Sequence, residues 1–286
     1  MKFFVVDAFT SEPFGGNPAG VVLLGRDGIF PTDELMRLVA AELRYSETAF
    51  VRQDGPTEFT VRYFTPAAEV DLCGHATIAT FGTLWREGIV PEGAVCINHT
   101  LASDLEVAVG EQVMMQMARP QAIDKHVDVM RLHTIMAGNA MTNWPEMPVE
   151  IISTGLPDII MPVGSVEDLN HLRPDMAALS DLSREFEVTG VHAFAIADDG
   201  YTAHVRNFGP LYGIPEESAT GTANGALTHY LHRRGIISAP TQCRFLQGEA
   251  MGRPSVVAAA LDNDGSIRVG GQSRIIAIGE LLVNSL

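Results

Sequence analysis

Two stretches of the 286-residue chain carry residue types that can do chemistry at the start of a helix. The first, DLCGHATIATFGTLWREGIV (residues 71–90), places Cys73 and His75 on either side of a glycine. The second, SATGTANGALTHYLHRRGII (residues 218–237), repeats the pattern with Thr220 where the cysteine stood. A helix N-terminus lowers the pKa of a thiol, so Cys73 is a candidate reactive group.

Both stretches also predict a site for an anion. The amides at a helix start are unpaired and carry partial positive charge, so they hold carboxylates and phosphates well. Gly74 and Gly221 would let the backbone approach such a ligand, with His75, Thr220 and Thr222 beside it. The alternative is that the two glycines only permit tight helix packing. Duplication of the pattern favours a site.

Other chemistries find less support in the sequence. A Cys-His hydrolase built on Cys73 and His75 is disfavoured, because residues two apart at a helix start are expected to diverge. His229 and His232 lack a carboxylate or cysteine at a convincing metal-ligand spacing, so no metal site is predicted. The chain has no dinucleotide fingerprint, Walker loop or zinc-protease motif, and we expect no cofactor.

An internal repeat positions the two helix starts. The motif R-x-F-x-P at residues 62–66 returns at 206–210, each time shortly before a glycine-led helix that a second glycine, Gly88 or Gly235, closes. Further helices are expected at residues 31–43 and 175–186. Short β-rich runs with turn signals fill most of the remainder, at residues 3–9, 19–24, 48–53, 58–64, 105–110, 112–117, 149–154, 158–163, 192–197, 202–208, 255–261 and 266–271.

Many strands around few helices predict an α+β fold of two similar lobes. Each lobe would be a curved, mostly antiparallel β-sheet or barrel around a central helix. We expect residues 1–119 with a returning C-terminal strand in 268–286 to form the first lobe, residues 120–267 to form the second, and the active site to lie between them.

Composition limits the partners. A formal net charge of −16 argues against nucleic acid or an anionic membrane, since both need basic patches. No apolar stretch reaches membrane-spanning length, and the N-terminus lacks the apolar core of a signal peptide. Three cysteines, Cys73, Cys96 and Cys243, form no C-x-x-C pair, which fits a cytoplasmic protein without disulfides.

Several long motifs, in order along nearly the whole chain, resemble the phenazine-biosynthesis PhzF-like isomerase family, which has a diaminopimelate-epimerase-like fold. They are VDAFTSEPFGGNPAGVV near the start, AELRYSETAFV at residues 41–51, VRYFTPAAEVDLCGHAT, RNFGPLYGIPEESATGTANG, and LQGEAMGRPS at residues 246–255. The resemblance implies a cofactor-independent active site and a homodimer.

The resemblance also implies roles for individual residues. The family's catalytic glutamate falls on Glu47 of Ser-Glu-Thr, its histidine on His75, its second acidic residue on Glu217 and its serine on Thr222. The chain departs from the family pattern here, because Glu217 is one methylene longer than the usual aspartate, Ser218 replaces proline or alanine, and Thr222 adds a methyl group. The family's substrate therefore cannot simply be transferred.

These residues predict an isomerase that moves a proton on a small carboxylated metabolite. Glu47 would be the general acid/base, assisted by His75, Glu217 and Thr222. Related epimerases use two opposed cysteines, whereas Thr220 occupies the second position here and is too weak a base, so Cys73 is disfavoured as a catalyst. The alternatives are a cysteine-assisted amino-acid racemase or epimerase, and a non-catalytic relative that binds small molecules or serves as a scaffold.

Overall fold

The computed structural model describes residues 1–26, 28–137 and 147–283. Among them no helix is long and apolar enough to cross a membrane. Residues 284–286, the end of the expected C-terminal segment, lie outside the described part.

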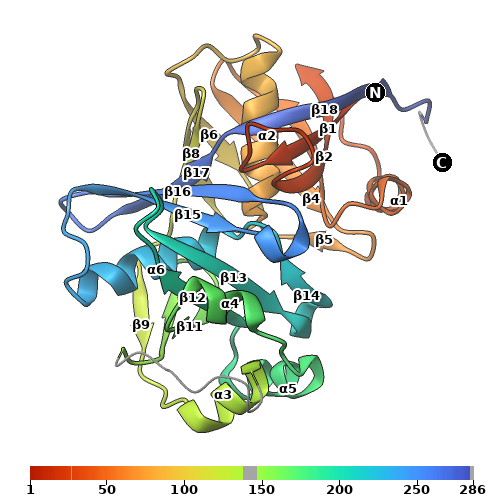
Figure 1. Ribbon diagram of the computed structural model, residues 1–286. Helices are drawn as coiled ribbons and strands as arrows, with labels where there is room; N and C mark the ends of the chain where they lie inside the picture. Colours follow the sequence, from red (N-terminus) through yellow and green to blue (C-terminus); the bar gives the residue numbers. More distant parts are fainter. Residues whose placement is uncertain (27, 138–146, 284–286) are drawn as a thin grey trace. The chain divides into compact units, whose positions relative to one another are not determined.

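The chain divides into two compact units (Figure 1). The first joins Met1–Gln116 to Gly270–Leu286, and the second is the continuous segment Met117–Val269.

The first unit consists mostly of strands, and its mixed pairing follows from its connections. β1 lies antiparallel to both β2 and β18. β2 pairs with β3, and β4 with β6, in parallel, because a helix lies between the members of each pair and a crossover of that length allows parallel strands. The strands are β1 (Lys2–Ala8), β2 (Asn17–Arg26), β3 (Thr48–Gln53), β4 (Glu58–Phe64), β5 (Glu69–Val70), β6 (Val95–His99), β7 (Asp104–Ala108), β8 (Val113–Gln116) and β18 (Ser273–Glu280).

The crossover helices of this unit differ in burial. α1 (Asp33–Leu43) is amphipathic, begins at a Thr32 hydroxyl cap and packs one face on Val22 and Phe50. α2 (Gly74–Arg86) is buried around most of its circumference. The hydroxyls of Thr77 and Thr83 donate to carbonyls one turn earlier, which lets these two polar side chains lie in the core.

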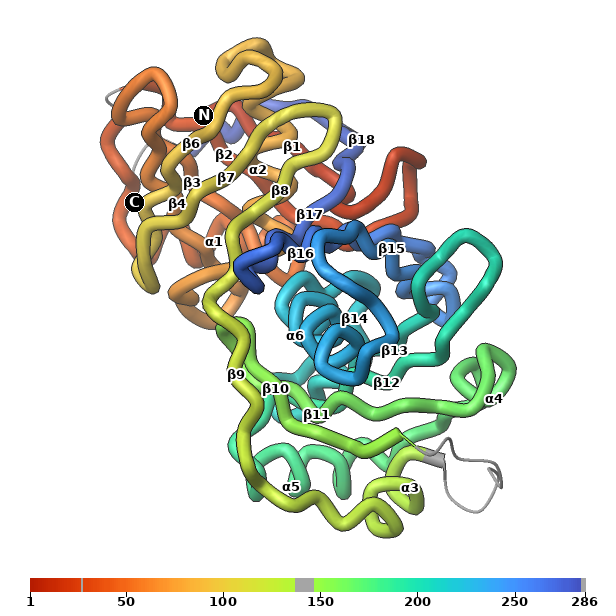
Figure 2. Tube along the Cα trace, turned by 90° about the vertical axis from the view of Figure 1, so that its left-hand side faces the viewer, coloured from red at the N-terminus to blue at the C-terminus, as the bar shows by residue number. Residues whose placement is uncertain are grey.

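The second unit repeats this order of elements. β11 pairs with β12, and β13 with β15, in parallel across helical crossovers, whereas β10–β11, β12–β13 and β15–β16 are antiparallel. β9 pairs with β10 in the second unit, in the way that β18 pairs with β1 in the first. Figure 2 traces the chain through these strands. The strands are β9 (Gln121–Ile123), β10 (Glu150–Ser153), β11 (Pro157–Pro162), β12 (Val191–Ile196), β13 (Ala203–Gly209), β14 (Ile214–Glu217), β15 (Thr241–Gln247), β16 (Ser255–Leu261) and β17 (Ile267–Gly271), the last spanning the boundary between units.

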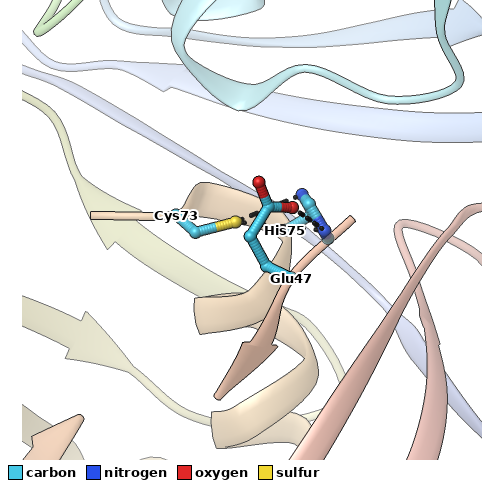
Figure 3. A group of neighbouring side chains, drawn as sticks. All are labelled: Glu47, Cys73 and His75. Atoms are coloured by element: carbon cyan, nitrogen blue, oxygen red, sulfur yellow. Dashed lines mark hydrogen bonds and ion pairs between the residues drawn. The ribbon is translucent and has the colours of Figure 1, made fainter. Parts of the chain in front are cut away.

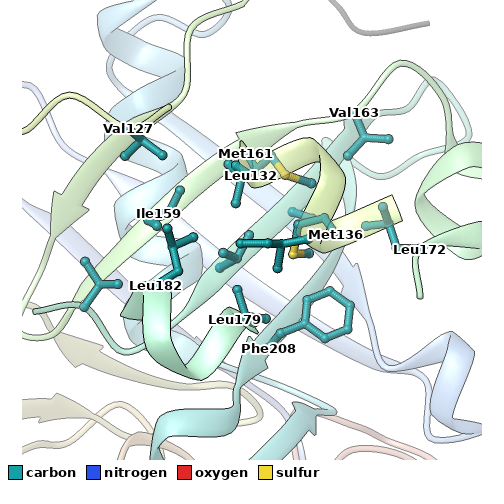
Figure 4. Close-up of a cluster of buried hydrophobic side chains, with 14 of the residues drawn as sticks. Val127, Leu132, Met136, Ile159, Met161, Val163, Leu172, Leu179, Leu182 and Phe208 are labelled. Atoms are coloured by element: carbon teal, nitrogen blue, oxygen red, sulfur yellow. The ribbon is translucent and has the colours of Figure 1, made fainter. Parts of the chain in front are cut away.

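Helices cover both faces of the second unit's sheet. An apolar core packs Leu132, Leu179 and Leu182 of the helices on Ile159 and Phe208 of the strands (Figure 4). α6 packs on β10 and β11. The helices are α3 (Val129–Ala137), α4 (Val166–His171), α5 (Met176–Phe186) and α6 (Gly221–Arg233), with short 3-10 turns η1 (Pro210–Tyr212) and η2 (Glu249–Met251).

The repeated motifs occupy equivalent places in the two units. Arg62 pairs through two hydrogen bonds with Glu69 on the neighbouring strand, and Arg206 does the same with Glu216. Gly88 and Gly235 both adopt positive φ, +69° and +70°, just beyond α2 and α6. The glycine closure predicted for both helices is therefore confirmed, because a left-handed residue there needs no Cβ.

The α+β class is confirmed, and most expected elements are present. α1 and α5 lie where helices were expected, whereas α3 and α4 were not predicted. β6 (VCINH) and β15 (TQCRFLQ) were also missed, because polar residues interrupt their apolar runs. The short strands β5, β9 and β14 were not predicted either.

Candidate active site

Three predicted or weighed residues of the first unit meet at the start of α2 (Figure 3). Oε2 of Glu47 lies 3.2 Å from Nε2 of His75, and the Ser46 hydroxyl lies 3.3 Å from the same nitrogen. The Cys73 sulfur lies 3.4 Å from Nδ1. His75 is 5% exposed and the Glu47 side chain 14% exposed. A carboxylate so largely removed from water is suited to act as a base on a carbon acid.

Close backbone packing positions Glu47. Arg44, the residue after α1, is in the left-handed conformation, and the chain turns there to reach β3, which begins at Thr48. The Gly20 amide donates to the Glu47 carbonyl at 3.2 Å. A Cβ on Gly20 would lie 2.8 Å from the Thr48 hydroxyl oxygen, so only glycine fits beside this strand. β2 and β3 thereby fix the backbone from which Glu47 projects.

The expected divergence of Cys73 and His75 was wrong. Cys73 precedes the helix, with an extended backbone at φ −140° and ψ 115°, so helical spacing does not govern its side chain. Its thiol instead turns toward the imidazole, as Figure 3 shows. This contact removes the geometric objection to a Cys-His pair, while leaving the thiol's chemical role to experiment.

The same three side chains form a group that could ligate a metal. Glu47, Cys73 and His75 each offer one ligand atom, and these atoms lie within 4.8 Å of one another. Thiolate, imidazole and carboxylate together suit zinc. His229 and His232 belong to no such group within the described residues. Sequence spacing missed this set because Glu47 is remote in the chain from the Cys-Gly-His motif.

The second unit gathers the other predicted residues at the start of α6. Thr220 precedes the helix, and its hydroxyl donates a 2.6 Å hydrogen bond to Oε2 of Glu217 at the end of β14. The carbonyl of Thr222 accepts a 2.8 Å bond from the Thr154 hydroxyl. Within the described residues, neither Cys73 before α2 nor Thr220 before α6 makes a side-chain cap hydrogen bond to its helix.

The motif at residues 246–255 supports Glu217, a role the sequence had not indicated. The Gln247 amide donates to the Glu217 carbonyl at 2.8 Å and accepts from the Thr220 amide at 3.1 Å. Gly248, at φ +82°, lies so close to Ser218 that an added Cβ would be 2.7 Å from the Ser218 carbonyl oxygen. The sequence motif contains Gln247 and Gly248, but it does not indicate that they contact the segment from Glu217 to Thr220.

A cavity of about 570 Å³ lies elsewhere in the second unit. Arg206, Arg173, Glu216 and Glu249 are among its lining residues. Arg206 is already bonded to Glu216 and to backbone carbonyls, and none of the predicted site residues lines this cavity. This cavity is therefore separate from the residues that the sequence predicted as a site.

Comparison with known proteins gives independent evidence of the family to which the chain is related. A family model described as "Phenazine biosynthesis-like protein" matches residues 6–279. A solved structure, the phenazine biosynthesis protein of the PhzF family from Bacillus anthracis, superposes with a TM-score of 0.88 at 27% identity, covering 99% of both chains.

Two curated relatives are named as isomerases. An uncharacterized isomerase of Clostridium acetobutylicum is 32% identical over 99% of this chain and 98% of its own length. The trans-2,3-dihydro-3-hydroxyanthranilate isomerase of Pseudomonas chlororaphis is 31% identical over 90% of this chain and 89% of its own.

Proposed function

This chain belongs to the phenazine biosynthesis-like protein family, and we propose that within this family of isomerases it moves a proton on a small carboxylated substrate without a cofactor. Glu47 would remove a proton bound to carbon and return it at another carbon. His75 would orient the Glu47 carboxylate and assist the proton transfer.

The contact between Glu47 and His75 carries this proposal. Nε2 of His75 is 3.2 Å from the carboxylate, and Nδ1 is turned to Cys73. An imidazole held from both sides can fix the direction of the Glu47 oxygen that meets the substrate. The 14% exposure of the Glu47 side chain limits competition from water.

The uncapped helix starts would bind the substrate carboxylate. Amides near Gly74 and His75 in the first unit, and near Gly221 and Thr222 in the second, are suited to this anion. Glu217 and Thr222 would assist binding and transfer, and Thr220 would orient Glu217 through its 2.6 Å bond. A carboxylate next to the reacting carbon also makes its proton more acidic once the negative charge is neutralised by such donors.

The experiment is solvent-deuterium exchange followed by NMR. The first probe is trans-2,3-dihydro-3-hydroxyanthranilate, the compound in the name of the relative, and the second is a panel of small amino-acid and hydroxy-acid carboxylates. Enzyme-dependent deuterium incorporation with product formation supports the isomerase. A protein that binds these carboxylates without any exchange would instead be a binding relative.

The second candidate is a cysteine-assisted racemase or epimerase. It is favoured by the 3.4 Å approach of the Cys73 sulfur to His75, which could take up the thiol proton. The corresponding position of the second unit is Thr220, whose hydroxyl is a weak base. Racemisation of a single stereocentre, lost in Cys73→Ser, would select this candidate.

A further inference from the structure

A chain of buried polar side chains runs beneath the start of α6. From Glu217 it passes through Thr220 to Gln247, whose Nε2 lies 3.1 Å from the Thr220 hydroxyl. The Asn224 amide then donates to Gln247 at 2.9 Å, and its oxygen lies 3.3 Å from Nε2 of His192. Apart from Glu217, every residue in this hydrogen-bonded series is less than 9% exposed.

The network continues across the sheet toward Asp158. Nδ1 of His192 lies 3.2 Å from the Asn207 amide, and Asn207 is opposite Glu217 in the ladder of β13 and β14. His192 is opposite Ile160 on β11, and Asp158 precedes Ile160 by two residues. Because side chains alternate along a strand, Asp158 lies on this same face.

Asp158 is a carboxyl group without an aligned partner. The residue is 1% exposed, and within the described residues neither of its oxygens has a partner with hydrogen-bond geometry. A buried ionised carboxylate in that setting is costly, whereas the protonated acid is not charged.

Neighbouring charge acts in the same direction as burial. Burial, and then the charge of Glu217, raise the pKa of Asp158 to about 8, and the approach of Asn207 offsets a smaller part of that rise. Burial lowers the pKa of His192, which also belongs to this network, to about 4, so His192 is neutral at pH 7. Asn207, Asn224, Thr220 and Gln247 carry no charge.

We propose that Asp158 is a positioning residue for Glu217, holding a proton at neutral pH so that Glu217 alone carries the negative charge beneath α6. The consequence for catalysis rests on the proposed function of Glu217. Ionisation of Asp158 would place a second negative charge in the network, and Glu217 would then take up a proton or move from Thr220.

The test uses NMR of protein carrying ¹³C-labelled aspartate side chains, titrated from about pH 5 to about pH 10. The folded wild type should show one aspartate carboxyl that titrates near pH 8. That resonance should vanish in Asp158→Asn and persist in Asp198→Asn, a matched change at an exposed residue of the same unit. In Glu217→Gln the Asp158 resonance should titrate at a lower pH, because the neighbouring negative charge is gone.

Two outcomes overturn the proposal. One is a resonance that titrates in the ordinary aspartate range, at about pH 4. The other is a titration unchanged by Glu217→Gln, a comparison that needs no Asp158 variant to fold. A pH profile of deuterium exchange gives a second readout, in which Asp158→Asn alters the alkaline limb and Asp198→Asn does not. Failure of the proposed isomerase would show as absent exchange in the wild type, which leaves the NMR result standing.

Discussion

His75 presents its two ring nitrogens to different partners, Nε2 to Glu47 at 3.2 Å and Nδ1 to the Cys73 sulfur at 3.4 Å. The imidazole therefore joins a carboxylate and a thiol that the sequence had separated into competing mechanisms. Substitutions of Glu47 and of Cys73 distinguish the glutamate mechanism from the thiol mechanism.

Glu47→Gln should keep the fold and ligand binding while lowering the exchange rate about 10²- to 10⁴-fold, because the amide keeps its shape but cannot accept the proton. Deuterium exchange and product formation are measured side by side. Glu42→Gln, at an exposed position of α1, is the matched control and should exchange as the wild type does. Full exchange in Glu47→Gln would remove this residue from the mechanism.

Cys73→Ser should retain turnover within about tenfold, because a hydroxyl preserves a polar neighbour for Nδ1 of His75 and such contacts contribute about 1 kcal/mol. The measurement is kcat and KM with the same probe. A loss of several orders of magnitude in kcat in a folded Cys73→Ser protein contradicts the glutamate mechanism and favours one in which the thiol transfers the proton.

Gly20→Ala should lower both stability and turnover. The new methyl group would lie 2.8 Å from the Thr48 hydroxyl oxygen, and overpacking of this kind costs about 1–3 kcal/mol. Urea denaturation and kcat are compared with Gly110→Ala, where the nearest atom is 3.7 Å from the added carbon. Equal effects of the two changes would show that Gly20 does not position Glu47.

Added Zn²⁺ should inhibit exchange, because Glu47, Cys73 and His75 offer ligand atoms within 4.8 Å of one another. Cys73→Ser should weaken that inhibition at least about tenfold, since it removes a thiolate ligand. Cys96→Ser, a buried cysteine outside the group, should leave it unchanged. If chelators abolish activity and zinc restores it, the metal-independent mechanism is wrong.

The stability of the protein should depend on pH through Asp158. Its pKa is raised from 3.8 to about 8 in the folded state, so the folded protein binds a proton that the unfolded chain releases. Stability should therefore fall as pH rises through that window, by up to about 4 kcal/mol between about pH 5 and pH 8. Urea denaturation of Asp158→Asn should lack this decline, whereas Asp198→Asn should keep it.

Local patterns predicted the central helices well. Glycine at the start and end of α2 and α6 and regular apolar spacing are properties of neighbouring residues, so the sequence displays them directly. The motif resemblance indicated Glu47, and the structure adds its contact with His75.

Contacts between residues that lie far apart in the sequence could not be predicted. Gln247 supports Glu217 from 30 residues away, and only the fold brings them together. Asp158 begins the run predicted as a strand at residues 158–163, and its burial follows from the pairing of β11 with β12 and the packing of α6 on β11, which the sequence does not display. The direction of the Cys73 side chain was predicted wrongly, because helical spacing was applied to a residue outside the helix.

The path of the chain also governs how the protein is made. The second unit is continuous, so all its residues are available once Val269 has left the ribosome. β1 is synthesised long before β18 (Ser273–Glu280), so one of its edges has no partner until β18 emerges. Nascent chains therefore carry an open edge on β1 until β18 has been made, and an open edge invites pairing with other chains. Loss of β18 would make that exposure permanent.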